Sequence, residues 1–357
     1  MNPSRRHVLS LAAVAAAAPL LPRPAAAAAD GLESTVVIRT TGGVFEAALK
    51  RNFFDPFTAA TGVRVVPVAA SYGDMMAKSA AMQAAGNVEW DIISPQYTEL
   101  ATISQYLEDL GDCGSMPNVA ADGVPGSCGR WGVLYLTGAQ VLAWNPKSYK
   151  DKVPQRWADF WDTKTFPGRR ALPNTGSPWA TLMLALLADG VPAAKLFPLD
   201  LDRSFHKLDA IKPDVATWWR TGNQSLTMWD SDEIAMSMMW SGTAYAGKRS
   251  GISLDWTYNQ SIADFGAWCI LKGAPHPNAA RAFINFYMAN PEHHAAFSKE
   301  MGYTTSNLAS HAMLSPEEKK ELISSPEMLA GIIKVDAAWL NANRATMLNR
   351  WNAWVSA

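Results

Sequence analysis

One stretch decides the fold class: Thr35-Val36-Val37-Ile38-Arg39-Thr40-Thr41-Gly42-Gly43-Val44-Phe45. Its β-branched beginning is typical of a short buried strand, the two glycines form a turn, and Phe45, Ala48 and Leu49 then recur on one helical face. The same order continues, with a strand expected at 63–68, a helix at 75–85 and a strand at 88–94. This alternation predicts an α/β fold with a parallel sheet.

The second half of the chain repeats the alternation. We expect helices at 179–188 and 278–289, strands at 234–240, 254–258 and 266–271, and a helical C-terminus. Trp218 and Trp219 are expected to pack from a helix. Extended runs at 138–145 and 254–271 are candidates for segments that cross between two units and absorb a hinge motion. A length of 357 residues fits two lobes of ordinary size.

The composition excludes several classes of protein. Apolar residues make up 48% and charged residues 18%, which is typical of a globular chain. With 31 basic and 32 acidic residues, the formal charge of −1 argues against a nucleic-acid partner and against a polybasic membrane binder. Fifteen Trp residues suit a protein that closes over a small organic ligand, although most of them are expected in the core.

Residues 1–29 are expected to be a bacterial signal peptide. Arg5 and Arg6 precede an apolar run, Val8 to Leu21, that is too short to span a bilayer, and an alanine tract offers a cleavage site near Ala29. The arginine pair resembles a twin-arginine signal; an ordinary secretory signal that carries two arginines is the alternative. Either signal predicts export to the periplasm.

The three cysteines fit an exported protein. Cys113 and Cys128 flank a loop rich in Gly, Pro and Ser, and in an oxidising compartment we expect them to form a disulfide, with two free thiols as the alternative. Cys269 lies in an apolar run at 266–271 and is expected to be a buried, inert thiol.

No catalytic motif stands out. The chain lacks a nucleophile elbow, a zinc-protease helix motif, a phosphate-binding loop and a dinucleotide-binding glycine pattern. His293 and His294 are adjacent in an expected surface helix, so they point about 100° apart and are poorly placed to share a metal. We therefore predict no catalytic residue, no metal and no cofactor.

Three stretches, taken in order, resemble the bacterial extracellular solute-binding proteins of ABC importers, of the spermidine/putrescine-binding type. They are residues 41–65, residues 91–95 and residues 279–307, the last ending in Gly302-Tyr303-Thr304-Thr305-Ser306-Asn307, which is similar to the family's G-Y-x-T-x-N. The resemblance implies a two-lobed fold of the type II periplasmic-binding-protein class, with a ligand cleft between the lobes, closure by a hinge, and no catalysis.

The resemblance also implies an organisation and partners. Lobe 1 is expected at 35–140 plus 266–310, and lobe 2 at 141–265 plus 311–357. A monomer is expected in the periplasm, where it captures a small organic solute and passes it to the transmembrane subunits of an ABC permease. A periplasmic ligand sensor, or a periplasmic enzyme on the same fold, is the alternative function.

Candidate ligand contacts come from two arguments. The loop from Thr40 to Gly43 follows a strand and opens a helix, where ligands and anionic oxygens bind. By resemblance, Trp240 falls on a tryptophan of the family's ligand cage, and Tyr97 lies within one residue of a loop tyrosine. The full candidate set is Thr40, Thr41, Gly42, Gly43, Tyr97, Ser177, Trp179, Trp240 and Asp264.

The charge pattern departs from that of polyamine binders. Where the family has acids, this chain has Ser177, Ala180 and Gly266. Asp264 lies two residues before Gly266 on an expected strand and so faces the same side, where it is a candidate to supply a negative charge. Each buried ammonium group needs a negatively charged partner. The ligand classes that fit better than a polyamine are therefore a monocation, a zwitterion such as an amino-acid derivative, and a neutral polar solute. A polyamine remains an open alternative.

Overall fold

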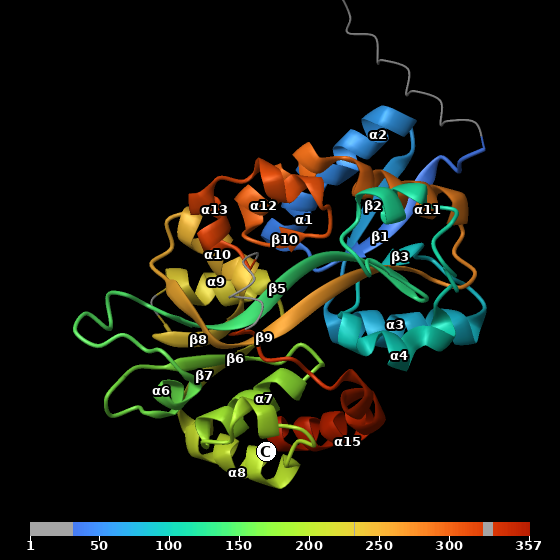
Figure 1. Ribbon diagram of the computed structural model, residues 1–357. Coiled ribbons are helices and arrows are strands. Elements are labelled where there is room, and N and C mark those ends of the chain that lie inside the picture. The colour runs from blue at the N-terminus through green and yellow to red at the C-terminus, as the bar shows by residue number, and fades with distance from the viewer. Residues whose placement is uncertain (1–30, 232, 324–330) are drawn as a thin grey trace, which may run out of the picture.

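A computed structural model describes residues 31–231, 233–323 and 331–357 (Figure 1). The expected signal peptide, residues 1–29, lies outside the described residues. The fold is mixed α/β, as predicted, with strands in the order β2-β1-β3-β9-β5-β8-β6-β7 and with β4 and β10 pairing with β5. None of the helices within the described residues is long and apolar enough to cross a membrane.

The N-terminal strands form one end of the sheet. β1 (Thr35–Thr40) pairs in parallel with β2 (Arg64–Ala69) and with β3 (Ile92–Ile93). β3 is shorter than the strand predicted at 88–94. The buried Asp91 carboxylate accepts the Val37 N–H at 2.6 Å, and the Asp91 N–H donates to the Val37 carbonyl oxygen at 2.9 Å. The connecting helices are α1 (Gly43–Leu49), a π-helical turn at Lys50–Phe54, α2 (Asp55–Thr61) and α3 (Tyr72–Ala85).

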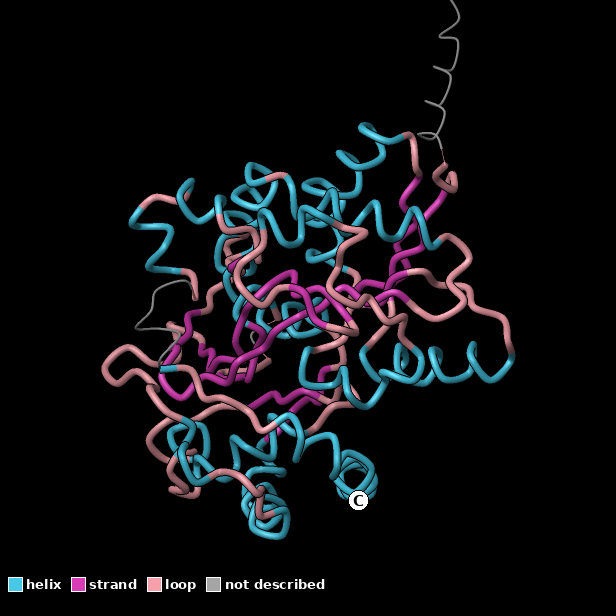
Figure 2. Tube along the Cα trace, turned by 45° about the vertical axis from the view of Figure 1, so that its right-hand side comes forward, coloured by secondary structure: helices cyan, strands magenta, loops and turns pink. Residues whose placement is uncertain are grey.

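Two long antiparallel strands cross the middle of the molecule (Figures 1 and 2). β5 (Gly132–Trp144) and β9 (Asp255–Ile270) pair from Val133 opposite Trp268 to Trp144 opposite Asp255. The strands expected at 254–258 and 266–271 are the two ends of this one strand, in agreement with the extended run expected at 254–271. Its polar middle contains Gln260 at a φ of 58° and a shift of register.

The other end of the sheet is built from β6 (Arg170–Pro173), β7 (Val215–Trp219) and β8 (Met236–Trp240), with β6 parallel to both neighbours. Trp218 and Trp219 lie in β7, not in a helix as expected, because the β-branched and aromatic run from Val215 favours a strand. Its helices are α6 (Trp157–Trp161), α7 (Trp179–Ala188), α8 (Leu201–Ile211), α9 (Gly222–Asp230) and α10 (Ser241–Arg249).

The C-terminal part supplies helices to both ends. Its elements are α11 (Pro277–Ala289), α12 (Pro291–Met301), β10 (Thr304–Thr305), α13 (Pro316–Glu321) and α15 (Ala337–Ser356). Between β3 and β5 lie α4 (Leu100–Ile103), α5 (Pro117–Asp122) and β4 (Cys128–Gly129). His294 in α12 is fully buried, contrary to the expectation of a surface helix; it contacts the Tyr287 carbonyl oxygen, and burial lowers its pKa to about 3.

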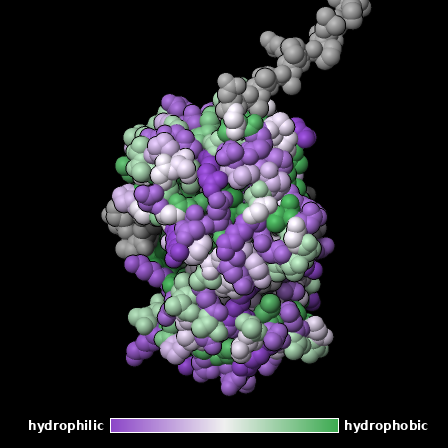
Figure 3. Space-filling view, turned by 90° about the vertical axis from the view of Figure 1, so that its right-hand side faces the viewer, coloured by the Kyte–Doolittle hydropathy of each residue, from purple (hydrophilic) through white to green (hydrophobic). Residues whose placement is uncertain are grey.

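The buried apolar residues fall mainly into two cores. The first core takes residues from 36–136 and 268–303, and the second core takes residues from 142–262 and 333–351. The predicted disulfide between Cys113 and Cys128 is present, and Cys269 is a buried free thiol. On the face shown in Figure 3, hydrophilic and hydrophobic residues are interspersed.

Candidate ligand-binding site

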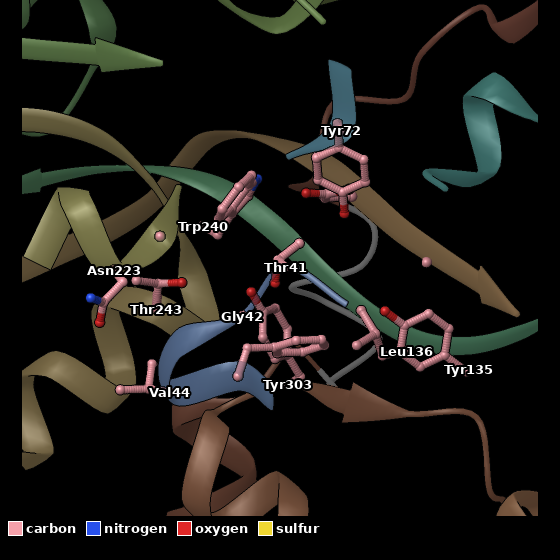
Figure 4. A pocket seen from close by; sticks show the side chains of 14 residues that line it. Thr41, Gly42, Val44, Tyr72, Tyr135, Leu136, Asn223, Trp240, Thr243 and Tyr303 are labelled. Atoms are coloured by element: carbon pink, nitrogen blue, oxygen red, sulfur yellow. The ribbon is translucent and has the colours of Figure 1, made fainter. Parts of the chain in front are cut away.

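A pocket lies where the crossing strands meet the starts of several helices (Figure 4). The space among its lining atoms is about 580 Å³, including the part that is open to solvent. Its lining comprises Thr41, Gly42, Val44, Phe45, Tyr72, Tyr135, Leu136, Gly222, Asn223, Trp240, Thr243, Asp264, Gly266 and Tyr303.

One carboxylate lines this pocket. Asp264 of β9 accepts a hydrogen bond from Gln96 Nε2 at 2.9 Å. Burial raises its pKa to about 7, and the nearby charge of Glu99 acts in the same direction, so the empty site holds a carboxyl group that is poised to ionise beside a cation. The amide oxygens of Gln96 and Gln140, both buried, have no hydrogen-bond partner among the described residues.

Packing at Gly266, two residues after Asp264, explains why that position carries no acidic side chain. It lies on the same face of β9 as Asp264, as the strand period requires. A Cβ atom at Gly266 would stand 2.5 Å from Cε1 of Tyr135. The Tyr135 ring, which stacks on Trp268 with centroids 4.1 Å apart, therefore takes the space of an acidic side chain.

Aromatic rings form much of the wall. Trp240, at the end of β8, packs edge to face against Trp219 and Tyr72, with ring centroids 5.1 Å and 6.0 Å away. Tyr303 lies edge to face with Phe45 at 5.9 Å. Ring faces attract ammonium groups, by roughly 0.5–2 kcal/mol each.

The start of α9 brings polar groups to another side of the pocket. Gly222 and Asn223 form its first turn, and the Thr221 hydroxyl accepts the Gln224 N–H as the helix cap. Figure 4 places Asn223 and Thr243 to one side of Trp240, and Tyr135 on the other side of the pocket. The positive end of a helix dipole favours a bound carboxylate.

The loop at Thr40–Gly43 is held by its own hydrogen bonds. Thr40 is fully buried; its hydroxyl donates to Glu46 and accepts the Gly42 N–H at 3.2 Å. The Gly42 N–H, which we expected to face a ligand, therefore donates to the Thr40 hydroxyl instead. Thr41 and Gly42 line the pocket, whereas exposed Gly43 faces Asn223.

Comparison with known proteins agrees with this architecture. The model of a family described as bacterial extracellular solute-binding protein matches residues 52–328. The chain belongs to that family. A Pseudomonas aeruginosa relative, named gamma-aminobutyric acid-binding protein, is 32% identical over 93% of this chain and 94% of its own length.

Two solved structures are similar to this solute-binding protein over almost the whole chain. Agrobacterium tumefaciens AttC, in an open unliganded conformation, is 37% identical, covers 90% of this chain and 100% of its own, and has a TM-score of 0.62. A. tumefaciens AgtB, in complex with agropinic acid, is 27% identical, covers 91% of this chain and 100% of its own, and has a TM-score of 0.81.

Besides Thr40 and Gly43, three more residues of the candidate set lie outside the pocket lining. Ser177 and Trp179 line a second, smaller pocket of about 280 Å³ with Glu99 and Arg344. Ser177 Oγ donates to Glu99 Oε1 at 2.7 Å, and the Trp179 ring belongs to the second core. Tyr97, in a short 3₁₀ turn, is 43% exposed and lines neither of these two pockets.

Sequence reasoning missed several lining residues of this solute-binding protein. Tyr303 stands in the quoted ending at 302–307 but was not singled out, and the cap pattern Thr221-Gly222-Asn223-Gln224 could have indicated the start of α9. The others are Val44, Phe45, Tyr72, Tyr135, Leu136 and Thr243.

Proposed function

We propose that this solute-binding protein captures a small, amino-acid-like zwitterion with one ammonium and one carboxylate group. The observation that carries the proposal is the single carboxylate in an aromatic pocket. Asp264 would pair with the ammonium, beside the Trp240 ring. A desolvated cation requires such a partner, so one acid suits one ammonium.

A second acid, Glu99, lies outside the lining of the pocket. Its Oε1 accepts from Ser177 and stands 3.3 Å from Arg344 Nη1. A diamine would therefore find one carboxylate, that of Asp264, in the lining of the pocket.

The carboxylate end of the ligand would face the start of α9. Gly222 comes close because it lacks a side chain: a Cβ there would stand 3.0 Å from Thr243 Oγ1. The Thr243 hydroxyl and the helix N-terminus would together favour an anion. The name of the P. aeruginosa relative, a gamma-aminobutyric acid-binding protein, supports the same class.

The remaining parts of the proposal concern the whole molecule. Lobes at 35–140 plus 266–310 and at 141–265 plus 311–357 would close about β5 and β9, and the closed monomer would deliver its ligand to an ABC permease in the periplasm. No metal-binding cluster of His, Cys, Asp or Glu occurs among the described residues, and the ligand would leave chemically unchanged.

Isothermal titration calorimetry with four compounds of equal carbon chain tests the ligand class. 4-Aminobutyrate carries both groups, butylamine only the ammonium, butyrate only the carboxylate, and putrescine two ammonium groups. We expect 4-aminobutyrate to bind at least about tenfold more tightly than each of the others, since each loses a charge-assisted hydrogen bond or adds an unpaired charge. Tightest binding of putrescine or butyrate would contradict the proposal.

A further inference from the structure

Two backbone segments touch where the structure brings the two ends of the sheet together. The Gly73 N–H, in the first turn of α3, donates to the Thr175 carbonyl oxygen at 3.0 Å. Gly176 has a φ of +85°, and a Cβ atom there would lie 2.7 Å from the Gly73 Cα and 3.2 Å from its nitrogen. We call this contact of Gly73 with Thr175 and Gly176 the clasp.

The clasp stands between two pockets. Tyr72, the residue before Gly73, lines the ligand pocket, whereas Ser177, the residue after Gly176, lines the second pocket. Beyond the clasp, Glu99 bonds to Ser177 and Arg344, and Thr102 donates to Asn341. The cleft is thus divided at the point where the two backbones meet.

α3 and the segment at 174–178 belong to different parts of the fold. α3 follows β2 at one end of the sheet, whereas residues 174–178 follow β6 at the other end. β5 and β9 cross between these ends. The clasp therefore joins two segments that follow strands at opposite ends of the sheet.

We propose that the clasp is the contact that sets the closed position and limits the length of the ligand. The proposal rests on the ligand pocket of the proposed function. A solute that fits between Asp264 and α9 leaves Gly73 and Thr175 free to meet. A longer solute that extends past Tyr72 toward Ser177 holds the two backbones apart. Gly73 and Gly176 act as positioning residues and do not touch the ligand.

A matched pair of substitutions isolates the clasp. Gly176→Ala places a methyl group against the Gly73 backbone, closer than Cβ atoms approach other atoms in proteins. Gly190→Ala is the control. Gly190 has a nearly equal φ of +83°, so the backbone strain is the same, but no atom lies within 4 Å of its Cβ position. Any difference between the two variants reports the contact and not the strain.

The first measurement uses ω-amino acids of two lengths. We expect wild type and Gly190→Ala to bind 4-aminobutyrate at least about tenfold more tightly than 6-aminohexanoate, and Gly176→Ala to lose at least about tenfold in affinity for the shorter compound, which brings the ratio toward one. Small-angle X-ray scattering with saturating 4-aminobutyrate should show a larger radius of gyration for Gly176→Ala only. Unchanged affinity, ratio and radius in Gly176→Ala would overturn the proposal.

A second measurement needs no ligand. The Gly73 N–H donates to the Thr175 carbonyl oxygen in the clasp, so its hydrogen should exchange with solvent slowly while the clasp is formed. We expect amide hydrogen exchange at Gly73 to be slow in wild type and Gly190→Ala and faster in Gly176→Ala. If wild type fails to bind 4-aminobutyrate, the proposed function fails and this exchange rate alone decides on the clasp; equal exchange in all three proteins would overturn the clasp.

Discussion

Replacing Asp264 by Asn should weaken ligand binding and abolish its dependence on pH. Because the pKa of Asp264 in the empty pocket is about 7, roughly half of the molecules hold a protonated Asp264 at neutral pH. An ammonium ligand requires the ionised form. The affinity of wild type for 4-aminobutyrate should therefore fall as the pH drops below 7, approaching about tenfold per pH unit, and should level off above it.

The size of the effect follows from the lost charge pair. A charge-assisted hydrogen bond contributes about 1.5–3 kcal/mol, so Asp264→Asn should weaken 4-aminobutyrate by about tenfold to 150-fold at pH 8. Titration calorimetry at pH 6, 7 and 8 measures both quantities. Asp202→Asn is the control, since Asp202 is highly exposed on α8. A variant of Asp264 that keeps wild-type affinity and pH profile would refute the role of this carboxylate.

The same residue predicts a change in stability of the opposite sign. A carboxyl group whose pKa is raised on folding destabilises the fold progressively as the pH rises from its unfolded value near 3.9 toward 7. A shift of about 3 units corresponds to about 4 kcal/mol, and because the pocket is partly open to solvent we expect about half of that. Without ligand, Asp264→Asn should therefore unfold at higher urea than wild type at pH 8, and the difference should shrink by pH 4.

Three further outcomes test the pocket and the fold. Trp240→Ala should weaken 4-aminobutyrate by about 2–4 kcal/mol in calorimetry while the melting temperature of the empty protein changes little, and Trp240→Leu should lose less; equal affinity would remove the ring from the site. Replacing both Cys113 and Cys128 by Ser should lower the free energy of unfolding in urea by about 3 kcal/mol, because their loop of 15 positions is no longer closed; an unchanged urea midpoint would contradict this. Gly266→Ala should displace the Tyr135 ring and cost at least about tenfold in affinity, with wild-type binding as the opposing result.

Local patterns in the sequence predicted most elements, and the reason is physical. The helix at 179–188 was predicted with its correct bounds, because a long apolar run followed by Gly190 is typical of a buried helix and its end. The disulfide followed from the compartment that a signal peptide implies. Asp264 and Gly266 were placed on one face because a strand has a period of two residues.

What the sequence did not reveal depends on contacts between distant segments. That Tyr135 fills the space beside Gly266 follows from the register of β5 against β9, which contains two irregularities that no local pattern encodes. Ser177 and Trp179 were assigned to the ligand pocket because the resemblance places family acids at the start of this helix. The contact of Gly73 with Thr175, 102 positions further along the chain, was not visible in the sequence. Tyr97 was assigned by its neighbourhood, but the direction of a ring in a 3₁₀ turn is set by packing.

Each of the two cores combines residues from distant parts of the sequence, and this affects folding during synthesis. The first core contains residues before 137 and residues after 267. The second core includes Leu340, Met347 and Trp351 of α15. During synthesis, therefore, neither core can be completed until nearly the whole chain has emerged from the ribosome. Long-range contacts of this kind slow folding and leave apolar surface exposed meanwhile. A nascent chain that stays unfolded this long is one that chaperones can bind before any part of it is committed to a native core.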